Sequence, residues 1–252
     1  MTGFALRRIA LVAALAPLAL GLAACNKEDA AGPALSGAPL AAIAPPAGKS
    51  WAETIAVTPE GGYLMGNPQA PIKLVEYGSL TCSHCAEFAH AATAELRDSF
   101  VASGRVSFEF RNFIRDAIDL TAAQLTHCGP PESFFALTDQ VFANQMTFME
   151  KAQTAGKPAQ DAAFSLEPAK RGPAIGELTG LTEFFASRGI AKDQANACLA
   201  DAAKAEAMAA QVTKQADQYQ ITGTPTFLIN GKKADFGAWP ELKVELERLG
   251  AR

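Results

Sequence analysis

The stretch "VEYGSLTCSHCAEF", residues 75–88, carries two cysteines, Cys82 and Cys85, with two residues between them. It overlaps a short, mostly apolar run, "IKLVEY" (72–77), which predicts a strand. It also leads into "CAEFAHAATAELRDSFVASG" (85–104), where apolar residues recur at helical spacing up to a glycine. The cysteine pair is therefore predicted where a strand ends and a helix begins. A pair in such a place can hold a metal, close a loop or exchange electrons.

The chemistry of the pair follows from the predicted start of the helix. A cysteine there has its thiolate beside unsatisfied backbone N–H groups and the positive end of the helix dipole, which lowers its pKa. Cys82 has this position, and Cys85, one turn later, is close enough to form a disulfide with it. His84 can add a hydrogen bond or a positive charge beside the thiolate. A pair whose reduced form is stabilised in this way is a strong oxidant.

The rest of the chain alternates strand and helix patterns. "VSFEFRNF" (106–113) alternates apolar and polar residues with a period of two, which predicts a second strand. Residues from about 116 to 210 are rich in Ala and Leu and helical in character. After them, "TPTFLIN" (224–230) and "KKADFG" (232–237) predict two short strands, and a closing helix begins at Trp239. This order predicts an α/β fold with a mixed sheet and an inserted helical block.

Three separated features together resemble one known family. These are the stretch at 75–88, the segment "GTPTFLING" (223–231) and the helical insertion, which resemble the DsbA-like branch of the thioredoxin superfamily over roughly residues 51–250. The resemblance implies a thioredoxin-like fold with a mixed central sheet and an inserted helical domain. It also implies a protein thiol-disulfide oxidoreductase whose redox-active disulfide needs no further cofactor and no metal.

The resemblance implies roles for individual residues. Cys82 would be the exposed nucleophile, Cys85 its buried partner, and Pro225 a cis-proline facing both. Between the cysteines this chain has Ser83-His84, where the best-known oxidase of the family has Pro-His, and this difference bears on the redox potential.

Two further residues join the predicted site. A cis bond before a proline costs only about 0.5–1 kcal/mol, so a turned backbone at Thr224-Pro225 can pair with an incoming peptide beside the disulfide. The alternative is a proline that merely begins an edge strand.

Glu76 matches the position of a buried acid in the superfamily, where burial would raise its pKa and let it relay protons to or from Cys85. The alternative is a solvated strand glutamate.

The remaining cysteines predict a second disulfide. The chain has five cysteines, and if Cys25 is set aside as an anchor, the other four allow three pairings. The spacing favours 82–85 together with 128–198. A Cys128–Cys198 bridge across about 70 residues would stabilise the helical insertion by roughly 4 kcal/mol in the chain-entropy estimate. The alternatives are two buried free thiols or an accessory redox pair.

The amino terminus predicts export and a lipid anchor. "MTGFALRRIALVAALAPLALGLAAC" (1–25) has two arginines before an apolar run from residue 9 to residue 24, so residues 1–24 are predicted to be a signal peptide. Sixteen apolar residues are fewer than the about 20 that a membrane-spanning helix needs. The ending Leu-Ala-Ala-Cys resembles the bacterial lipoprotein box, which implies that Cys25 is acylated. The alternative is an ordinary signal peptidase site.

Residues 25–50 are rich in Ala, Pro and Gly and predict a flexible tether before a domain at 51–252. Removal of residues 1–24 lowers Lys+Arg from 22 to 20 against Asp+Glu 26, a net charge of −6, which argues against nucleic acid as a partner. The expected place is the periplasmic side of the cell envelope. Asn26 is not the aspartate associated with inner-membrane retention of lipoproteins in many diderm bacteria, which favours the outer membrane.

These features predict a membrane-tethered enzyme that transfers a Cys82–Cys85 disulfide to reduced or unfolded exported proteins. The resemblance implies a quinone-linked membrane oxidase as the partner that reoxidises it. One alternative keeps the fold and makes the protein a disulfide isomerase or reductase. Another is a metal-binding lipoprotein in which Cys82, His84 and Cys85 capture zinc or copper(I), although the second Cys-x-x-Cys usual in zinc sites is absent.

Overall fold

The computed structural model describes residues 37–252, so the predicted signal peptide and Cys25 lie outside the described residues. The strands are β1 (Ile55–Val57), β2 (Tyr63–Gly66), β3 (Ile72–Gly78), β4 (Val106–Asn112), β5 (Thr226–Ile229) and β6 (Lys232–Lys233). The α-helices are α1 (Ser83–Glu95), α2 (Ala117–Thr126), α3 (Phe134–Ala143), α4 (Gln145–Phe164), α5 (Pro168–Thr179), α6 (Leu181–Ala186), α7 (Lys192–Ala200), α8 (Ala202–Tyr219) and α9 (Trp239–Arg248). Shorter helical turns are Trp51–Glu53 and Pro131–Ser133, and a π-helical segment, Leu96–Val101, extends α1.

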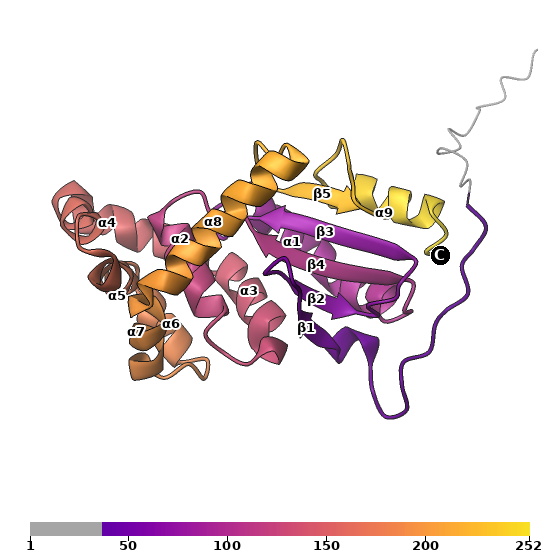
Figure 1. The fold of residues 1–252 in the computed structure, drawn as a ribbon, viewed down its shortest axis with the longest axis horizontal. Coiled ribbons are helices and arrows are strands. Elements are labelled where there is room, and N and C mark those ends of the chain that lie inside the picture. The colour runs from indigo at the N-terminus through magenta and orange to yellow at the C-terminus, as the bar shows by residue number, and fades with distance from the viewer. Residues whose placement is uncertain (1–36) are drawn as a thin grey trace, which may run out of the picture. The chain divides into compact units, whose positions relative to one another are not determined.

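The strands form one mixed sheet in the order β1-β2-β4-β3-β5-β6 (Figure 1). β3 and β4 are parallel because α1 crosses over between them, and the other neighbours are antiparallel. The central strand β3 is buried at every residue except Lys73, as its apolar sequence requires. The predicted α/β class and mixed sheet are therefore confirmed.

The strand predicted from "VSFEFRNF" is confirmed as β4, but both of its faces are buried. Its polar face is satisfied internally, because Arg111 makes two hydrogen bonds to Glu109, at 2.7 and 3.0 Å. Arg111 also donates a hydrogen bond to the Tyr77 hydroxyl at 2.9 Å. Burial of this ion pair is tolerated because each charge has its partner.

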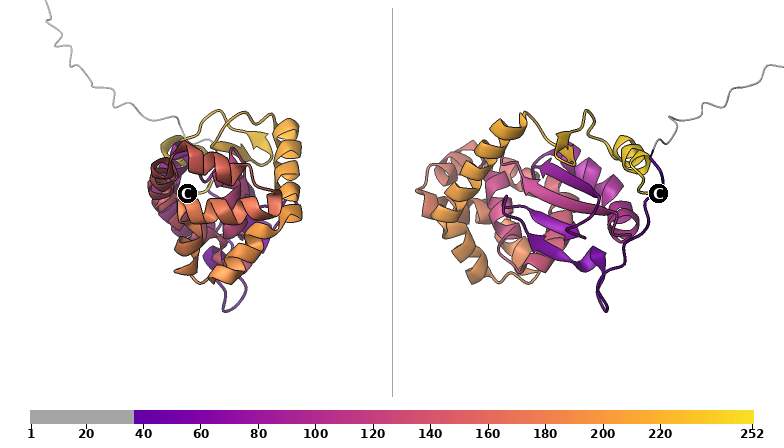
Figure 2. Two further views of the ribbon diagram at one scale, coloured as in Figure 1. Left: turned by 90° about the vertical axis from the view of Figure 1, so that its left-hand side faces the viewer. Right: turned by 45° about the vertical axis from the view of Figure 1, so that its right-hand side comes forward.

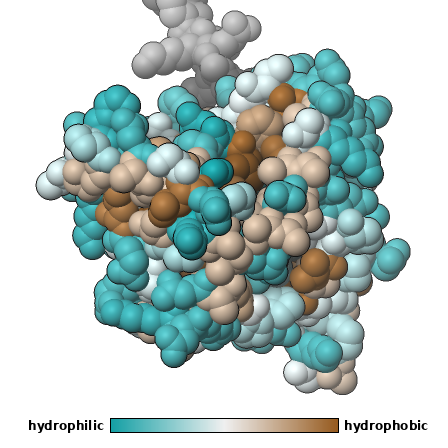
Figure 3. Space-filling model, turned by 60° about the vertical axis from the view of Figure 1, so that its left-hand side comes forward, coloured by the Kyte–Doolittle hydropathy of each residue, from teal (hydrophilic) through white to brown (hydrophobic). Residues whose placement is uncertain are grey.

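The predicted helical insertion is confirmed between β4 and β5. It runs from α2 to the end of α8 at Tyr219, past the predicted end near residue 210. Figures 1 and 2 show α4–α7 grouped beyond one end of the sheet, whereas α8 runs back from this group toward β5. Seen from the side of this group, hydrophilic residues cover most of the face and strongly apolar residues form separate patches (Figure 3).

The insertion and the sheet share one hydrophobic core. A single cluster of buried residues includes Leu74 of β3, Cys85 of α1, Phe134 of α3, Phe185 of α6 and Leu246 of α9. The helical insertion is thus packed into the same core as the cysteine pair, and its residues can reach the redox site. Within residues 37–252, the structure has no helix with the length and apolar character needed to cross a bilayer.

The second half of the predicted tether, residues 37–50, is not a free linker. The Leu40 N–H donates a hydrogen bond to the Gly250 carbonyl at 2.9 Å, and the Ile43 N–H donates one to the Ser103 carbonyl at 2.9 Å. The prediction of a flexible tether up to residue 50 is wrong for this part, because its backbone groups are paired with the folded domain.

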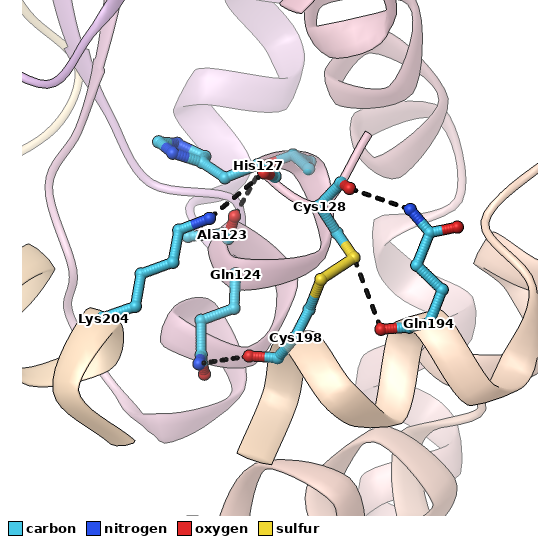
Figure 4. The surroundings of a disulfide bond; sticks show 8 residues. Ala123, Gln124, His127, Cys128, Gln194, Cys198 and Lys204 are labelled. Carbon is cyan, nitrogen blue, oxygen red and sulfur yellow. Dashed lines mark hydrogen bonds between the residues drawn. A yellow bond between two sulfur atoms is a disulfide. The ribbon is translucent and has the colours of Figure 1, made fainter. Parts of the chain in front are cut away.

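The predicted second disulfide is present. Cys128, directly after α2, is bonded to Cys198 in α7, with Cα atoms 5.9 Å apart (Figure 4). The Gln194 amide donates a hydrogen bond to the Cys128 carbonyl at 3.1 Å, and the Gln124 amide donates one to the Cys198 carbonyl at 3.2 Å. The bridge therefore joins the end of α2 to α7 within the insertion.

Replacing both Cys128 and Cys198 with alanine is expected to lower the free energy of unfolding by about 2–4 kcal/mol, because the bridge closes a long loop in the unfolded chain. Urea denaturation of the variant and the wild type at pH 7 measures the difference. The matched control is Cys82→Ala/Cys85→Ala, which keeps the bridge. Equal midpoints for the bridge variant and the wild type would contradict a stabilising role.

Candidate active site

Cys82 is the N-cap residue of α1, with extended backbone angles (φ −90°, ψ 121°) directly before the first helical residue. Its thiol donates a hydrogen bond to the Thr224 carbonyl, with Sγ and O 3.3 Å apart. The residue is only 4% exposed, so the prediction of an exposed nucleophile is wrong for this structure. The segment at Thr224, which is distant in sequence, lies against the sulfur.

The pKa of the Cys82 thiol lies below its usual value. Burial alone raises this pKa, but hydrogen bonds from the Thr224 side chain, from the backbone N–H groups of Cys85 and His84 and from the Cys85 thiol outweigh it. The predicted effect of the helix start is thus confirmed in direction. Cys82 is the sulfur of the pair that more readily carries a negative charge.

Cys85 has the opposite environment. It is fully buried, and the Ser79 N–H donates a hydrogen bond to its sulfur at 3.5 Å. Burial, followed by the nearby charge of Glu76, raises the pKa of the Cys85 thiol far above its usual value. Both cysteines are free thiols here, so the structure represents the reduced form of the pair. The two sulfurs are therefore asymmetric: Cys82 favours the thiolate and Cys85 the thiol.

Glu76 is buried in β3 at 3% exposure, which excludes the solvated alternative. Burial raises the pKa of its carboxyl well above the usual value, and the charges of Asp139 and Cys82 add to the increase. Within the described part of the chain, its Oε1 atom has no hydrogen-bond partner. The proton relay to Cys85 stays a prediction, with an acid of suitable burial and charge in place for it.

The Thr224-Pro225 peptide bond is cis, as predicted. Beside it is a surface hollow of about 410 Å³, whose lining includes Pro225, His84 at the start of α1 and the aromatic side chains Phe88 and Trp239. The hollow is also lined by Thr224, whose carbonyl contacts Cys82, and we call it the client hollow.

The thioredoxin family model matches residues 58–246, which include the cysteine pair, the cis-proline and the whole helical insertion. The chain belongs to the thioredoxin family, in its DsbA-like branch. The crystal structure of a protein-disulfide isomerase from Novosphingobium aromaticivorans is 34% identical, with a TM-score of 0.70 over 75% of this chain and 97% of that one.

Other members of the thioredoxin family are more distant. Wolbachia pipientis alpha-DsbA1 shares the fold, with 24% identity and a TM-score of 0.58 over 74% of this chain and 89% of that one. A Rickettsia bellii protein named as a protein-disulfide oxidoreductase is 26% identical over 177 residues, 70% of this chain and 60% of the relative. The chain thus spans about 60% of the length of that curated relative.

Two buried side chains of the insertion hold the loop before Cys82 in this DsbA-like site, and neither is predicted from the sequence. Gln145 of α4 donates hydrogen bonds to the Leu80 carbonyl at 2.9 Å and to the Cys82 carbonyl at 3.0 Å. Asp119 of α2 accepts a hydrogen bond from the Leu80 N–H at 2.8 Å, and burial raises its pKa to about 6. The position of Asp119 in the first turn of a predicted helix could have suggested that it binds backbone N–H groups. Nothing in the sequence distinguishes Gln145.

The His84 side chain does not lie beside the Cys82 sulfur, as the prediction of a hydrogen bond or charge there requires. Ser83 is exposed and begins α1, and the His84 imidazole is exposed beside Glu87, with Nδ1 and Oε2 3.1 Å apart. His84 acts on Cys82 through its backbone N–H, and its ring points to Glu87 in place of the sulfur. In residues 37–252, no three or more His, Cys, Asp and Glu side chains are grouped in a way that could hold a metal ion.

Replacing Thr224 with valine is expected to make the DsbA-like pair less oxidising. The Cys82 thiol bonds to the Thr224 backbone carbonyl, which valine keeps, but the Thr224 side chain also lowers the pKa of Cys82, so its loss destabilises the thiolate and with it the reduced form. A hydrogen bond to a charged group contributes about 1.5–3 kcal/mol, so the equilibrium with glutathione should shift by about tenfold or more, ~30 mV per tenfold. Thr213→Val, on the exposed side of α8, is the matched control. An unchanged equilibrium would contradict the assignment.

Proposed function

We propose that this protein is a thiol-disulfide oxidoreductase that transfers the Cys82–Cys85 disulfide to reduced, unfolded proteins exported to the cell envelope. The observation that carries the proposal is the asymmetry of the pair: hydrogen bonds lower the pKa of Cys82, whereas burial raises that of Cys85. A stabilised Cys82 thiolate favours the reduced enzyme, which makes its disulfide a good electron acceptor. Family membership supports the same chemistry.

The transfer proceeds in two exchanges. A client thiolate attacks Cys82 Sγ, the Cys82–Cys85 bond breaks, and Cys85 leaves and takes up a proton from Glu76. A second client thiolate then attacks the client sulfur of the mixed disulfide, and Cys82 leaves as a thiolate. Two electrons pass from the client to the enzyme. The reduced enzyme must then be reoxidised, and we propose a quinone-linked membrane oxidase for that step.

The client hollow supports an unfolded protein as the substrate. Its apolar side chains, Phe88 and Trp239, lie next to the backbone at Thr224-Pro225. An extended peptide can place apolar side chains there while its backbone pairs with the segment before the strand. Such recognition depends little on sequence, as an enzyme with many clients requires.

The reduction potential of the Cys82–Cys85 pair tests the direction of the reaction. We expect a value close to about −120 mV, as for a strong oxidant, and rapid oxidation of reduced, unfolded ribonuclease by a stoichiometric amount of oxidised enzyme. A potential near about −270 mV, typical of a reductant such as thioredoxin, together with failure to oxidise ribonuclease, would contradict the proposal.

Disulfide isomerase activity is a second candidate, favoured by the similarity to the Novosphingobium protein, which is described as a protein-disulfide isomerase. An isomerase attacks wrong disulfides with its reduced Cys82, so it must act on scrambled ribonuclease without net oxidation. Recovery of ribonuclease activity from the scrambled form, by catalytic amounts of the reduced protein, distinguishes the two functions.

The proposed site of action is the periplasmic side of the envelope, with the protein held to the outer membrane by an acylated Cys25. Replacing Cys25 with alanine is expected to move the protein from the membrane fraction to the soluble periplasmic fraction, because the lipid chains would be lost. Fractionation of cells expressing each form checks this. An unchanged distribution would exclude the lipid anchor.

A further inference from the structure

A small, partly enclosed cavity lies beside Glu76. Its volume is about 20 Å³, and its polar lining includes Glu76 of β3 together with Thr138 and Asp139 of α3. Glu76 Oε1 and Thr138 Oγ1 are both buried and, among the described residues, both lack a hydrogen-bond partner. A water molecule needs roughly 10–15 Å³ and two to four polar partners, and the cavity offers both.

Asp139 also borders the outside of the molecule. A surface hollow of about 220 Å³ is lined by Asp139 and by His90, Thr93 and Arg97. Asp139 and Thr93 line both the cavity and the surface hollow, and the Thr93 hydroxyl donates a hydrogen bond to Asp139 Oδ1 at 3.4 Å. The half-buried Asp139 carboxylate therefore borders both the cavity beside Glu76 and the solvent-filled hollow.

This surface hollow is separate from the client hollow. The residues of α1 that line the client hollow include His84 and Ala91. The surface hollow is lined by His90 of α1 and by Arg97 of its π-helical extension. At about 100° per residue, these two sets of positions lie on different faces of the helix. A client bound over Cys82 would leave the surface hollow open to water.

We propose that Asp139, through one water molecule in the cavity, carries protons between Glu76 and solvent during disulfide exchange. The inference rests on the proposed function. When Cys85 leaves as a thiolate it takes a proton from Glu76, which regains one from Asp139 through the water, and Asp139 takes one from solvent. When the pair is reoxidised, each proton moves the other way. The carboxyl groups exchange protons only, and the sulfurs exchange the electrons.

The charges around Asp139 suit this exchange. Burial raises the pKa of Asp139 to about 6, against the lowering effects of the Thr93 hydrogen bond and of the positive charges of Arg97 and His90. The charge of Asp139 in turn raises the pKa of Glu76. A carboxyl group whose pKa is near neutral can both accept and donate a proton at physiological pH.

Single-turnover oxidation by 5,5′-dithiobis(2-nitrobenzoate) tests the path. Cys82 attacks the reagent and releases one thionitrobenzoate, and Cys85 then loses its proton, attacks Cys82 and releases the second. In Asp139→Asn we expect the first release to be unchanged and the second to slow by about tenfold. Added acetate should restore the second rate in the variant and have no effect on the wild type. Thr138→Val, which removes a partner of the water, should also slow only the second release.

The matched control is Asp161→Asn, which removes an exposed carboxylate that pairs with Lys157 in α4 and lines neither the cavity nor the surface hollow. It should behave as the wild type. An equal second rate and pH profile for Asp139→Asn and wild type would overturn the path. A second outcome would also overturn the path: the pH profile of Asp139→Asn is shifted, but its maximal second rate is unchanged and acetate has no effect. Asp139 would then act only through its charge beside Glu76 and would carry no proton. Failure of the proposed function itself would differ, since the wild-type enzyme would not oxidise ribonuclease.

Discussion

Replacing Cys85 with alanine is expected to abolish turnover and to leave a partner that brings its own disulfide, such as glutathione disulfide, covalently attached to Cys82 as a stable mixed disulfide. Cys85 is fully buried beside Cys82 and supplies the thiol that resolves the mixed disulfide during reoxidation. Attack from within the same site has a very high effective concentration, so its loss should prolong the mixed disulfide by about 10³-fold or more. The Cys82 thiolate keeps the hydrogen bonds that it accepts from the backbone N–H groups at the start of α1.

Glutathione disulfide provides a simple probe for this variant. Mass spectrometry should find one stable glutathione adduct per Cys85→Ala molecule, whereas the wild type should pass through the adduct to its internal disulfide. The Cys82→Ala variant is the matched control and should form no lasting adduct, because the pKa of buried Cys85 is far above its usual value. A stable adduct on Cys82→Ala and none on Cys85→Ala would reverse the assigned roles of the two sulfurs.

The parts of this site that the sequence predicts are those governed by neighbouring residues. The apolar run of β3, the helical spacing of α1 and the two-residue gap between Cys82 and Cys85 are all local, so they fix the place of the pair at a helix start. The cis peptide before Pro225 and the burial of Glu76 required the family resemblance in addition. A strand glutamate or a proline alone is compatible with several environments.

Residues supplied by the insertion could not be predicted in the same way. Gln145 and Asp139 reach the redox site only because the helices of the insertion pack into the core of the sheet. The phenylalanines of residues 134–149 mark a core-facing stretch, but no local pattern distinguishes Asp139 or Gln145 from the other polar residues in it. Their roles depend on tertiary contacts between segments that are far apart in the chain.

Short elements held by distant contacts were missed for the same reason. β1 and β2 have three and four residues, and they form a hairpin across a turn in which Gly61 adopts a positive φ of 76°. The Pro- and Gly-containing sequence between them was the available signal for a hairpin. Residues 37–50 have the composition of a linker, and only their pairing with the folded domain orders them.

Replacing Glu76 with glutamine is expected to slow the proton-dependent exchange at Cys85 by about 10²-fold or more, the usual contribution of a general acid or base. Glutamine has nearly the same shape but cannot donate or accept the proton that Cys85 exchanges. Attack by Cys82 on the first thionitrobenzoate group should be almost unchanged, because hydrogen bonds at the start of α1 and from Thr224 stabilise its thiolate. Stopped-flow measurement of the two releases separates these steps, and equal slowing of both would contradict the assigned role.

The same substitution should change how stability depends on pH. Burial raises the pKa of Glu76 in the folded state above that in the unfolded state, so the folded protein binds the proton more tightly. The stabilisation that comes from this tighter proton binding is therefore complete below the pKa of the unfolded state, about 4.3. It is lost as the pH rises through the raised pKa of the folded state. Relative to the wild type, Glu76→Gln should become progressively more stable from pH 4 upward.

Urea denaturation of the reduced proteins between pH 4 and pH 9 measures this difference. Asp119 and Asp139, whose pKa values are also raised by burial, are present in both proteins, so their contributions largely cancel in the comparison. A glutamine amide with imperfect hydrogen bonds would lower the free energy of unfolding by the same amount at every pH. The titration of the Glu76 carboxyl is therefore measured by how the difference between the two proteins changes with pH, and not by its size at one pH. Glu132→Gln, at an exposed position in the Pro131–Ser133 turn, is the matched control, and its stability should vary with pH as that of the wild type does. If Glu76→Gln also runs parallel to the wild type, Glu76 has no raised pKa in the folded protein, and the buried acid cannot serve Cys85 as proposed.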